Sequence, residues 1–168
     1  VMPKSLIFNW EREMERFAPQ ISTYTFYGLS REYEAMRSAN VVFTTYATMR
    51  NEIEKLKEEQ FYYVILDESQ NIKNLATQTT KAALLLHGKH RLALSGTPIE
   101  NNLAELYALF HFLNPAMFGS AAQFTEDYLI PIQKHNDKEA TRQLRRKIYP
   151  FVLRRLKKDV LADLPDKI

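Results

Sequence analysis

Short apolar segments alternate with helical patterns in the N-terminal part of the chain, and this alternation constrains the fold more than any other feature. Strands are expected at residues 23–27, 40–45, 61–66 and 91–94, and a helix over about 74–87 separates the last two. Strands that are apolar on both faces and separated by helices are typical of a parallel sheet built from βαβ units. The sequence therefore predicts an α/β fold in which helices cover the sheet.

The first helix has a clear apolar stripe and a clear end. Trp10, Met14 and Phe17 recur at helical spacing, and they predict a helix over residues 6–18 that Pro19 ends. The stripe favours a place for Trp10 in the core over stacking on a nucleic-acid base.

After Pro98 the strand signals stop and only helices are expected. The first of them carries a wide apolar stripe over residues 103–113, with Asn102 and Glu105 placed as a capping pair. The last is expected over residues 138–149. This part of the chain therefore reads as a helical segment that follows the sheet.

The composition is that of an ordinary globular protein, with 45% hydrophobic and 12% aromatic residues. Cysteine is absent, which excludes disulfides and thiolate metal sites, and the four histidines lack the spacing of zinc ligands. No apolar run approaches the roughly 18 residues needed to cross a bilayer, so no membrane partner is expected.

Charge is distributed unevenly along the chain. Residues 1–133 hold 12 Lys and Arg against 15 Asp and Glu, a net −3, whereas residues 134–158 hold 10 against 2, a net +8. A basic block of this kind contacts phosphates in some proteins and is a solvated helix face with a polar connector in others. Charge alone leaves both interpretations open.

An acidic pair, Asp67–Glu68, directly follows the apolar run of residues 61–66. The sequence SGTP follows the next expected strand and begins at Ser95, 95 − 67 = 28 residues later. Parallel sheets bind ligands at the carboxyl ends of their strands, where two carboxylates are able to hold a phosphate-bound Mg²⁺ and position a hydrolytic water. A solvated loop followed by an ordinary turn would use the same residue types.

Several longer segments add to this pair. DESQNIKN resembles the DExx box of superfamily 2 helicase-like ATPases, LALSGTPIENNLAEL resembles motif III, and VVFTTYATMR resembles motif Ib. PKSLIFNWEREMERF is similar to the segment after motif Ia, and FVLRRLKKDVLADLPDKI to the stretch that leads to the second lobe. Together they resemble the Swi/Snf family of DNA-translocating, chromatin-remodelling ATPases, in its bacterial form. The resemblance implies a partial RecA-like (P-loop NTPase) lobe, with a three-layer parallel sheet that lacks the P-loop strand.

The resemblance also implies ATP and Mg²⁺ as cofactors and assigns roles to single residues. Asp67 would hold Mg²⁺ through water, Glu68 would orient the attacking water, and Gln70 would face the γ-phosphate. Ser95 and Thr97 look like residues that couple the nucleotide state to the grip on DNA. The plainer alternative for them is a turn that caps the next helix.

For double-stranded DNA, the resemblance points to the loop of Lys4 and Ser5 and to Thr44, Thr45 and Tyr46. Hydroxyls, backbone amides and a lysine suit phosphate contacts, which position a protein without reading sequence.

The basic run that begins with Arg154 and Arg155 joins the two lobes in the family. It would contact DNA, brace the lobes or stay a solvated linker.

By the same resemblance, residues 1–101 would be the C-terminal part of the first RecA-like lobe, 102–150 a helical insertion and 151–168 a connector toward a second lobe. No GxxxxGK[ST] phosphate loop occurs in the sequence. This chain alone is therefore expected to lack ATPase activity, and the open edge of its strand at 91–94 is expected to promote self-association.

The function expected of the full-length protein is ATP-dependent translocation on double-stranded DNA, together with transcription or nucleoid protein complexes. The protein would be cytoplasmic in a bacterium and nuclear in a eukaryote. Two alternatives stay open, a non-catalytic protein-interaction module derived from such an ATPase and an RNA helicase of the same superfamily.

Overall fold

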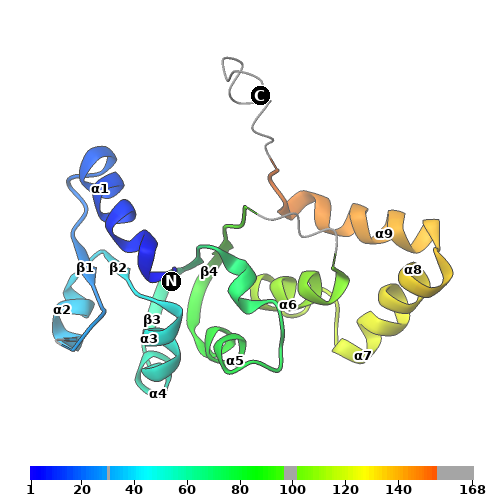
Figure 1. The fold of residues 1–168 in the computed structure, drawn as a ribbon, viewed down its shortest axis with the longest axis horizontal. Helices are drawn as coiled ribbons and strands as arrows, with labels where there is room; N and C mark the ends of the chain where they lie inside the picture. Colours follow the sequence, from blue (N-terminus) through cyan, green and yellow to red (C-terminus); the bar gives the residue numbers. More distant parts are fainter. Residues whose placement is uncertain (30, 97–101, 155–168) are drawn as a thin grey trace, which may run out of the picture. The chain divides into compact units, whose positions relative to one another are not determined.

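The computed structural model describes residues 1–29, 31–96 and 102–154 (Figure 1). The chain divides into two compact units, Val1–Ala121 and Ala122–Ile168. In chain order the elements of the first unit are η1 (Lys4–Leu6), α1 (Ile7–Phe17), β1 (Thr23–Thr25), α2 (Tyr33–Ser38), β2 (Val41–Phe43), α3 (Tyr46–Asn51), α4 (Ile53–Leu56), β3 (Gln60–Leu66), η2 (Ser69–Ile72), α5 (Gln78–Leu85), β4 (His87–Ala93) and α6 (Leu103–Leu113).

The described strands of the first unit form two parallel pairs, β1 with β2 and β3 with β4. Thr23 lies opposite Val41 in the first pair, and Leu66 lies opposite Ala93 in the second. In each pair, at least one helix lies between the two strands in sequence, which is typical of parallel pairing. The predicted α/β architecture with parallel strands is therefore confirmed.

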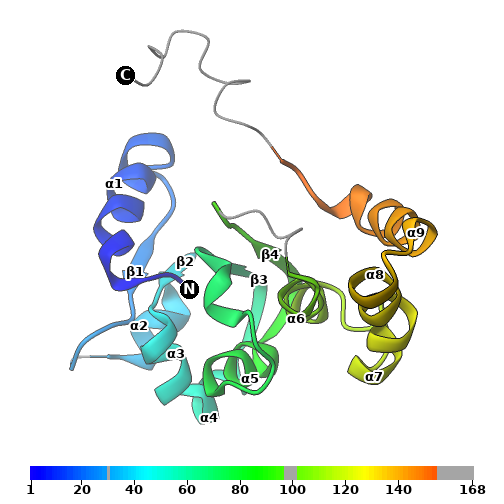
Figure 2. The same ribbon diagram turned by 45° about the vertical axis from the view of Figure 1, so that its right-hand side comes forward.

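The first two residues join the two strand pairs. The Val1 nitrogen donates a hydrogen bond to the Ile65 carbonyl at 2.7 Å, and the Asp67 amide donates to the Val1 carbonyl at 2.8 Å. On the other side, Met2 N donates to Thr44 O at 3.0 Å. Val1 and Met2 thus lie between the ends of β2 and β3 and hold these two ends side by side (Figure 2).

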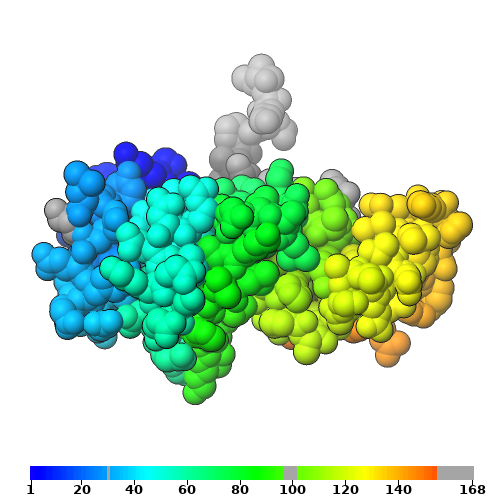
Figure 3. Space-filling model, turned by 90° about the horizontal axis from the view of Figure 1, so that it is seen from below, coloured from blue at the N-terminus to red at the C-terminus, as the bar shows by residue number. Residues whose placement is uncertain are grey.

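The main core lies against the face of β3 that carries Val64 and Leu66. Helices α2, α3, α4, α5 and α6 contribute buried side chains to it, and the cyan surface of α3 and α4 adjoins the green surface of α5 in Figure 3. The buried members are Phe26, Met36, Tyr46, Met49, Leu56, Val64, Leu66, Ile72, Ala82, Ala83, Leu86, Leu109 and Phe112.

A smaller core lies on the opposite face of β2. There Trp10 and Met14 of α1 pack against a cluster that includes Phe43, and Val41 packs against the same cluster. Val42, which alternates with Val41 and Phe43 along β2, packs against the main core. Helices therefore cover both faces of β2, as the predicted three-layer arrangement requires.

The outer face of the β3–β4 pair is less covered. Tyr63, Ile65 and Leu92 are 54%, 40% and 44% exposed. Among the described residues, β4 pairs with β3 alone, so its second edge has no strand on it. The self-association expected from this edge stays a prediction.

Strand β4 begins earlier than the sequence indicates. The predicted helix over 74–87 is shorter, because α5 ends at Leu85 and β4 starts at His87. The segment HGKH has little strand propensity, but it pairs with β3 along the whole length of that strand. Gly88 permits the close approach, since a Cβ there would lie 2.7 Å from Val64 Cγ2.

Arg91 ties α6 to the sheet. Its guanidinium donates to Phe112 O and to Leu86 O, both at 2.8 Å, and lies 4.9 Å from the centre of the Phe112 ring. Burial lowers the pKa of Arg91, yet the positive charge is well placed at the carboxyl ends of two helices. Helix α6 therefore belongs to the first compact unit. The functional division predicted at residue 102 stays a prediction.

After Leu113 the described elements are all helical. They are α7 (Ala121–Phe124), which begins at the last residue of the first unit, a π-helical turn (Thr125–Leu129), α8 (Ile130–His135), α9 (Lys138–Ile148) and η5 (Tyr149–Phe151). Asp137 caps α9 by accepting from Glu139 N and Ala140 N. Leu144 and Ile148 are buried on one side of α9. In the part of the chain that the structure describes, no helix is both long enough and apolar enough to cross a membrane.

Candidate functional site

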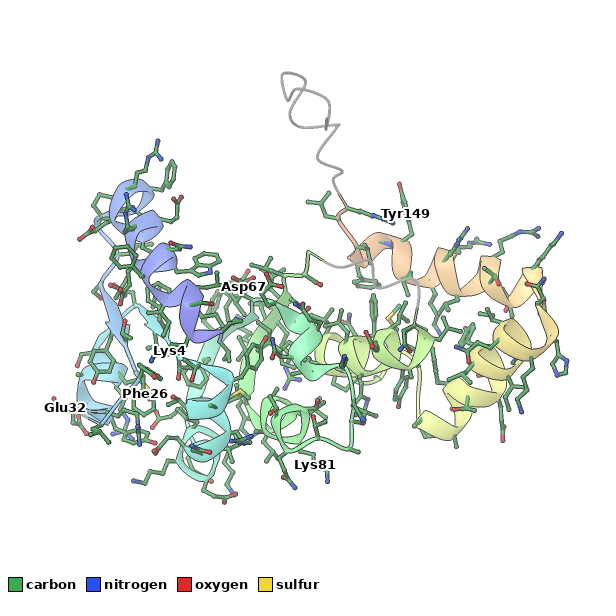
Figure 4. The ribbon with its side chains drawn as sticks, in the orientation of Figure 1. Lys4, Phe26, Glu32, Asp67, Lys81 and Tyr149 are labelled. Carbon is green, nitrogen blue, oxygen red and sulfur yellow. The ribbon has the colours of Figure 1, made fainter. Side chains whose placement is uncertain are left out.

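The acidic pair lies at the carboxyl end of β3, where the strand passes into η2. Figure 4 labels Asp67 at this position. Asp67 and Glu68 are each half-buried. Asp67 Oδ1 accepts from Glu68 N at 2.8 Å, and Asp67 Oδ2 accepts from Trp10 Nε1 at 2.7 Å. The Asp67 side chain is thus held at both oxygens.

The hydroxyl of Tyr46 holds the backbone at the same point. It donates to Asp67 O at 2.8 Å. Burial raises the pKa of Tyr46 above its ordinary value, and the nearby carboxylates of Asp67 and Glu68 raise it further. The hydroxyl therefore stays protonated and remains a donor at physiological pH.

Glu68 has an unusual backbone conformation. Its φ of 50° and ψ of 54° lie in the left-handed region, which costs a non-glycine residue on the order of 1–2 kcal/mol. The Glu68 carbonyl accepts from Asn71 Nδ2 at 2.8 Å and from Asn71 N at 3.1 Å, which stabilises the turn. Conformations of this kind occur often at functional sites.

Polar side chains connect the ends of β3 and β4. Gln70 Nε2 donates to Glu68 Oε2 at 2.6 Å, and Ser95 Oγ donates to Gln70 Oε1 over a long 3.4 Å. Ser69 N also donates to Leu94 O at 2.9 Å. The expected neighbourhood of the acidic pair and Ser95 is present in the fold. Thr97 lies outside the described residues.

The carboxylate oxygens at the end of β3 suit a Mg²⁺ ion that is bound together with a nucleotide. Each oxygen of Asp67 takes one of the hydrogen bonds above, and a carboxylate oxygen has a second lone pair. In nucleotide sites Mg²⁺ usually binds one or two carboxylates and takes its other ligands from phosphates and water. Among the described residues no cluster of three or more His, Cys, Asp or Glu could enclose a metal ion. Asp67 and Glu68 therefore fit a site in which phosphates and water supply most of the Mg²⁺ ligands, and not a site in which protein side chains alone enclose the ion.

The predicted DNA residues fall into two groups. Lys4 and Ser5 are exposed in η1, directly before α1, and the Lys4 ammonium lies 5.4 Å from the centre of the Tyr27 ring. These two side chains are open to a ligand.

The second group is buried, with Thr44, Thr45 and Tyr46 only 8%, 4% and 7% exposed. Thr44 Oγ1 donates to Phe26 O at 2.9 Å. Thr45 caps α3 by accepting from Thr48 N at 3.1 Å. All three hydroxyls therefore have partners inside the protein, and their predicted role toward DNA stays a prediction.

Arg154 is exposed, and Arg155 lies outside the described residues. The role of the basic run toward DNA or toward a second lobe also stays a prediction.

The sequence did not indicate the two side chains that donate hydrogen bonds to Asp67. These are Trp10, which donates to the carboxylate, and Tyr46, which donates to the backbone carbonyl. Trp10 is 57 residues from Asp67 and Tyr46 is 21. Helical periodicity indicates that Trp10 turns toward the sheet, but it does not say which strand end its indole reaches.

Comparison with known proteins shows one consistent similarity. A family model for the SNF2-related domain matches residues 1–168. YwqA of Bacillus subtilis, assigned by name to the ATP-dependent helicases/translocases, is 40% identical over 175 residues, which cover 100% of this chain and 19% of that protein. The TATA-binding protein-associated factor mot1 of Schizosaccharomyces pombe is 38% identical over 183 residues, covering 100% of this chain and 9% of that protein.

Solved structures agree with this similarity. The Sulfolobus solfataricus SWI2/SNF2 ATPase core in complex with dsDNA matches with a TM-score of 0.84 and 38% identity, over 99% of this chain and 36% of that chain. The core domain of the same organism matches with a TM-score of 0.81 and 39% identity. This chain thus spans less than a fifth of the length of the relatives named above, and about a third of the length of the solved cores.

Proposed function

The chain belongs to the SNF2-related family, and from this premise we propose that it supplies the metal-holding and water-orienting carboxylates of an ATP-driven motor on double-stranded DNA. The observation that carries the proposal is the hydrogen-bonded group at the ends of β3 and β4, in which Glu68, Gln70 and Ser95 are linked. Because these side chains link the ends of β3 and β4, a ligand bound at the end of one strand is able to shift the groups at the end of the other.

Each carboxylate has its own task in this proposal. Asp67 is oriented at both oxygens, as a metal ligand or a ligand of metal-bound water has to be. Glu68, whose Oε2 accepts from Gln70 Nε2, orients the attacking water and accepts its proton. Mg²⁺, when bound, offsets the charge that develops on the phosphates. The phosphate-binding lysine and a transition-state arginine would come from elsewhere in the full-length protein, so this chain alone is proposed to be inactive.

Stimulation of the ATPase by double-stranded DNA or by RNA distinguishes a DNA motor from an RNA helicase. We expect double-stranded DNA to raise the ATPase rate of the full-length protein and RNA of the same length to leave it near the basal rate. The reason is the similarity to an ATPase core that was solved with double-stranded DNA. Phosphate release at one salt concentration measures both. Stronger stimulation by RNA would contradict the proposal. The proposed place of action is the DNA, in the cytoplasm of a bacterium or the nucleus of a eukaryote.

Lys4 is proposed to neutralise one DNA phosphate. We expect Lys4→Ala to weaken binding of duplex DNA to the full-length protein equally for all sequences. The slope of log affinity against log salt should fall by about 1, because one phosphate contact and its released counterion are lost. Fluorescence anisotropy at several salt concentrations measures the slope.

Lys81 offers a matched control, since it is an exposed lysine on α5. Lys81→Ala removes the same charge and should leave the slope unchanged. Equal slopes for Lys4→Ala and the unmodified protein would remove Lys4 from the DNA interface.

A further inference from the structure

A side chain of α1 reaches the carboxylate that the proposed function assigns to Mg²⁺. Trp10 Nε1 donates to Asp67 Oδ2 at 2.7 Å across 57 residues of sequence. The length is at the short end for an N–H···O bond and typical of a bond to a charged acceptor. Such bonds are about twice as strong as bonds between neutral groups.

This hydrogen bond limits how the Asp67 carboxylate can turn. Oδ1 already accepts from Glu68 N, so rotation of the carboxylate away from its present orientation would break at least one of the two bonds. In metal sites, donors of this kind hold the ligand ready, and their loss typically costs 10–100-fold in metal affinity.

The indole is half-buried and held by packing as well as by its hydrogen bond. Trp10, like Met14, packs against the small core of Met2, Ile7 and Phe43 between α1 and β2. Its helix starts at Ile7, directly after the exposed turn η1 that carries Lys4 and Ser5. A displacement of η1 would therefore be passed along one helical segment to the indole N–H.

We propose that Trp10 is a positioning residue whose indole N–H holds Asp67 in the orientation that binds Mg²⁺ and connects this carboxylate to the Lys4–Ser5 turn. The inference rests on the proposed function, which assigns Mg²⁺ to Asp67 and DNA to the turn. Trp10 touches neither nucleotide nor metal in this scheme.

The first test measures binding of a fluorescent ATP analogue to the full-length protein while Mg²⁺ is titrated. Trp10→Phe keeps an aromatic ring but removes the donor. We expect the Mg²⁺ concentration for half-maximal binding to rise by about 10-fold or more, while binding of the analogue in EDTA is unchanged. Duplex DNA should lower this Mg²⁺ concentration in the unmodified protein and have little effect in Trp10→Phe.

Met14→Ala serves as the matched control, because it loosens the same small core and leaves the indole in place. It should lower the thermal unfolding midpoint without a selective change in the Mg²⁺ requirement. An equal change in that requirement for both variants would show that packing alone is responsible and would overturn the proposal. An unmodified protein in which DNA does not change the requirement would overturn the link to the turn.

A double-mutant cycle with Asp67→Asn tests whether Trp10 acts through Asp67 and whether Asp67 itself sets the Mg²⁺ requirement. If Trp10 acts through Asp67, Trp10→Phe adds no further change in the Asp67→Asn protein, and a full additional change would overturn the inference. If Asp67→Asn alone leaves the Mg²⁺ requirement unchanged, the metal assignment of the proposed function fails as well.

Hydrogen exchange gives a measurement that needs no Trp10 variant to fold. The indole N–H of Trp10 should exchange slowly in the unmodified protein and faster in Asp67→Ala, where its acceptor is gone. Equal exchange rates would show that the bond does not protect the indole, and would overturn the inference.

Discussion

Glu68→Gln is expected to lower ATP hydrolysis by the full-length protein by about 10²–10⁴-fold, the usual contribution of a general base. The amide has the same shape as the carboxylate and tolerates the same left-handed backbone, but it accepts no proton from the attacking water. Its oxygen still accepts the hydrogen bond from Gln70, so the turn should keep its structure. Nucleotide binding should be retained, because Asp67 is unchanged. Phosphate release with saturating duplex DNA measures the first effect, and equilibrium nucleotide binding the second.

Glu13→Gln gives the matched control. Glu13 is exposed on α1, and the same change in charge there should leave turnover unaltered. Unchanged turnover in Glu68→Gln would remove this carboxylate from the reaction. A phenotype of the full-length protein that survives Glu68→Gln would instead favour the alternative of a non-catalytic interaction module.

Phe112→Ala should lower the free energy of unfolding of the first compact unit by about 3–5 kcal/mol, as large-to-small substitutions of buried aromatic residues do. Phe112 is 0% exposed in the main core, and the Arg91 guanidinium lies over its ring. Removing the ring leaves a cavity between β4 and α6, and the Arg91 guanidinium loses the ring against which it packs. Urea unfolding of this chain, with the slope m compared as well as the midpoint, measures the loss.

Phe8→Ala is the same chemical change at an exposed position, since Phe8 is 64% exposed on α1. Its cost should stay within about 0.5 kcal/mol. A similar cost for both variants would show that α6 does not form part of the cooperative core. The helical segment would then begin at residue 102, as the sequence indicates.

Much of the fold was predictable because local patterns carry it. The apolar runs at 40–45 and 61–66 became β2 and β3, and the stripe with Trp10 became α1. The capping pair at the start of α6 is also present, with Asn102 accepting from Glu105 N at 3.3 Å and donating to Glu105 Oε1 at 3.1 Å. Periodicity and capping act over a few residues, so a single sequence displays them.

The start of β4 was not predictable in this way. HGKH lacks the residues that favour strands, and it becomes a strand because β3 provides a neighbouring ladder of hydrogen bonds. The burial of Thr44 and Thr45 follows from the same kind of context, since their hydroxyls find partners at Phe26 and Thr48. A hydroxyl that suits a phosphate in sequence can be fully used inside the protein.

For the site, the sequence by itself determined that two carboxylates follow a buried strand and that a serine follows the next one, because strand ends are visible as the end of an apolar run. Only the tertiary structure decided which groups hold them. Val1 and Met2 bring the ends of β2 and β3 together, and packing of α1 on β2 carries the Trp10 indole to Asp67. These contacts depend on how the helices and strands pack against one another. Trp10 and Asp67 are 57 positions apart, and no local sequence pattern reveals a contact over that separation.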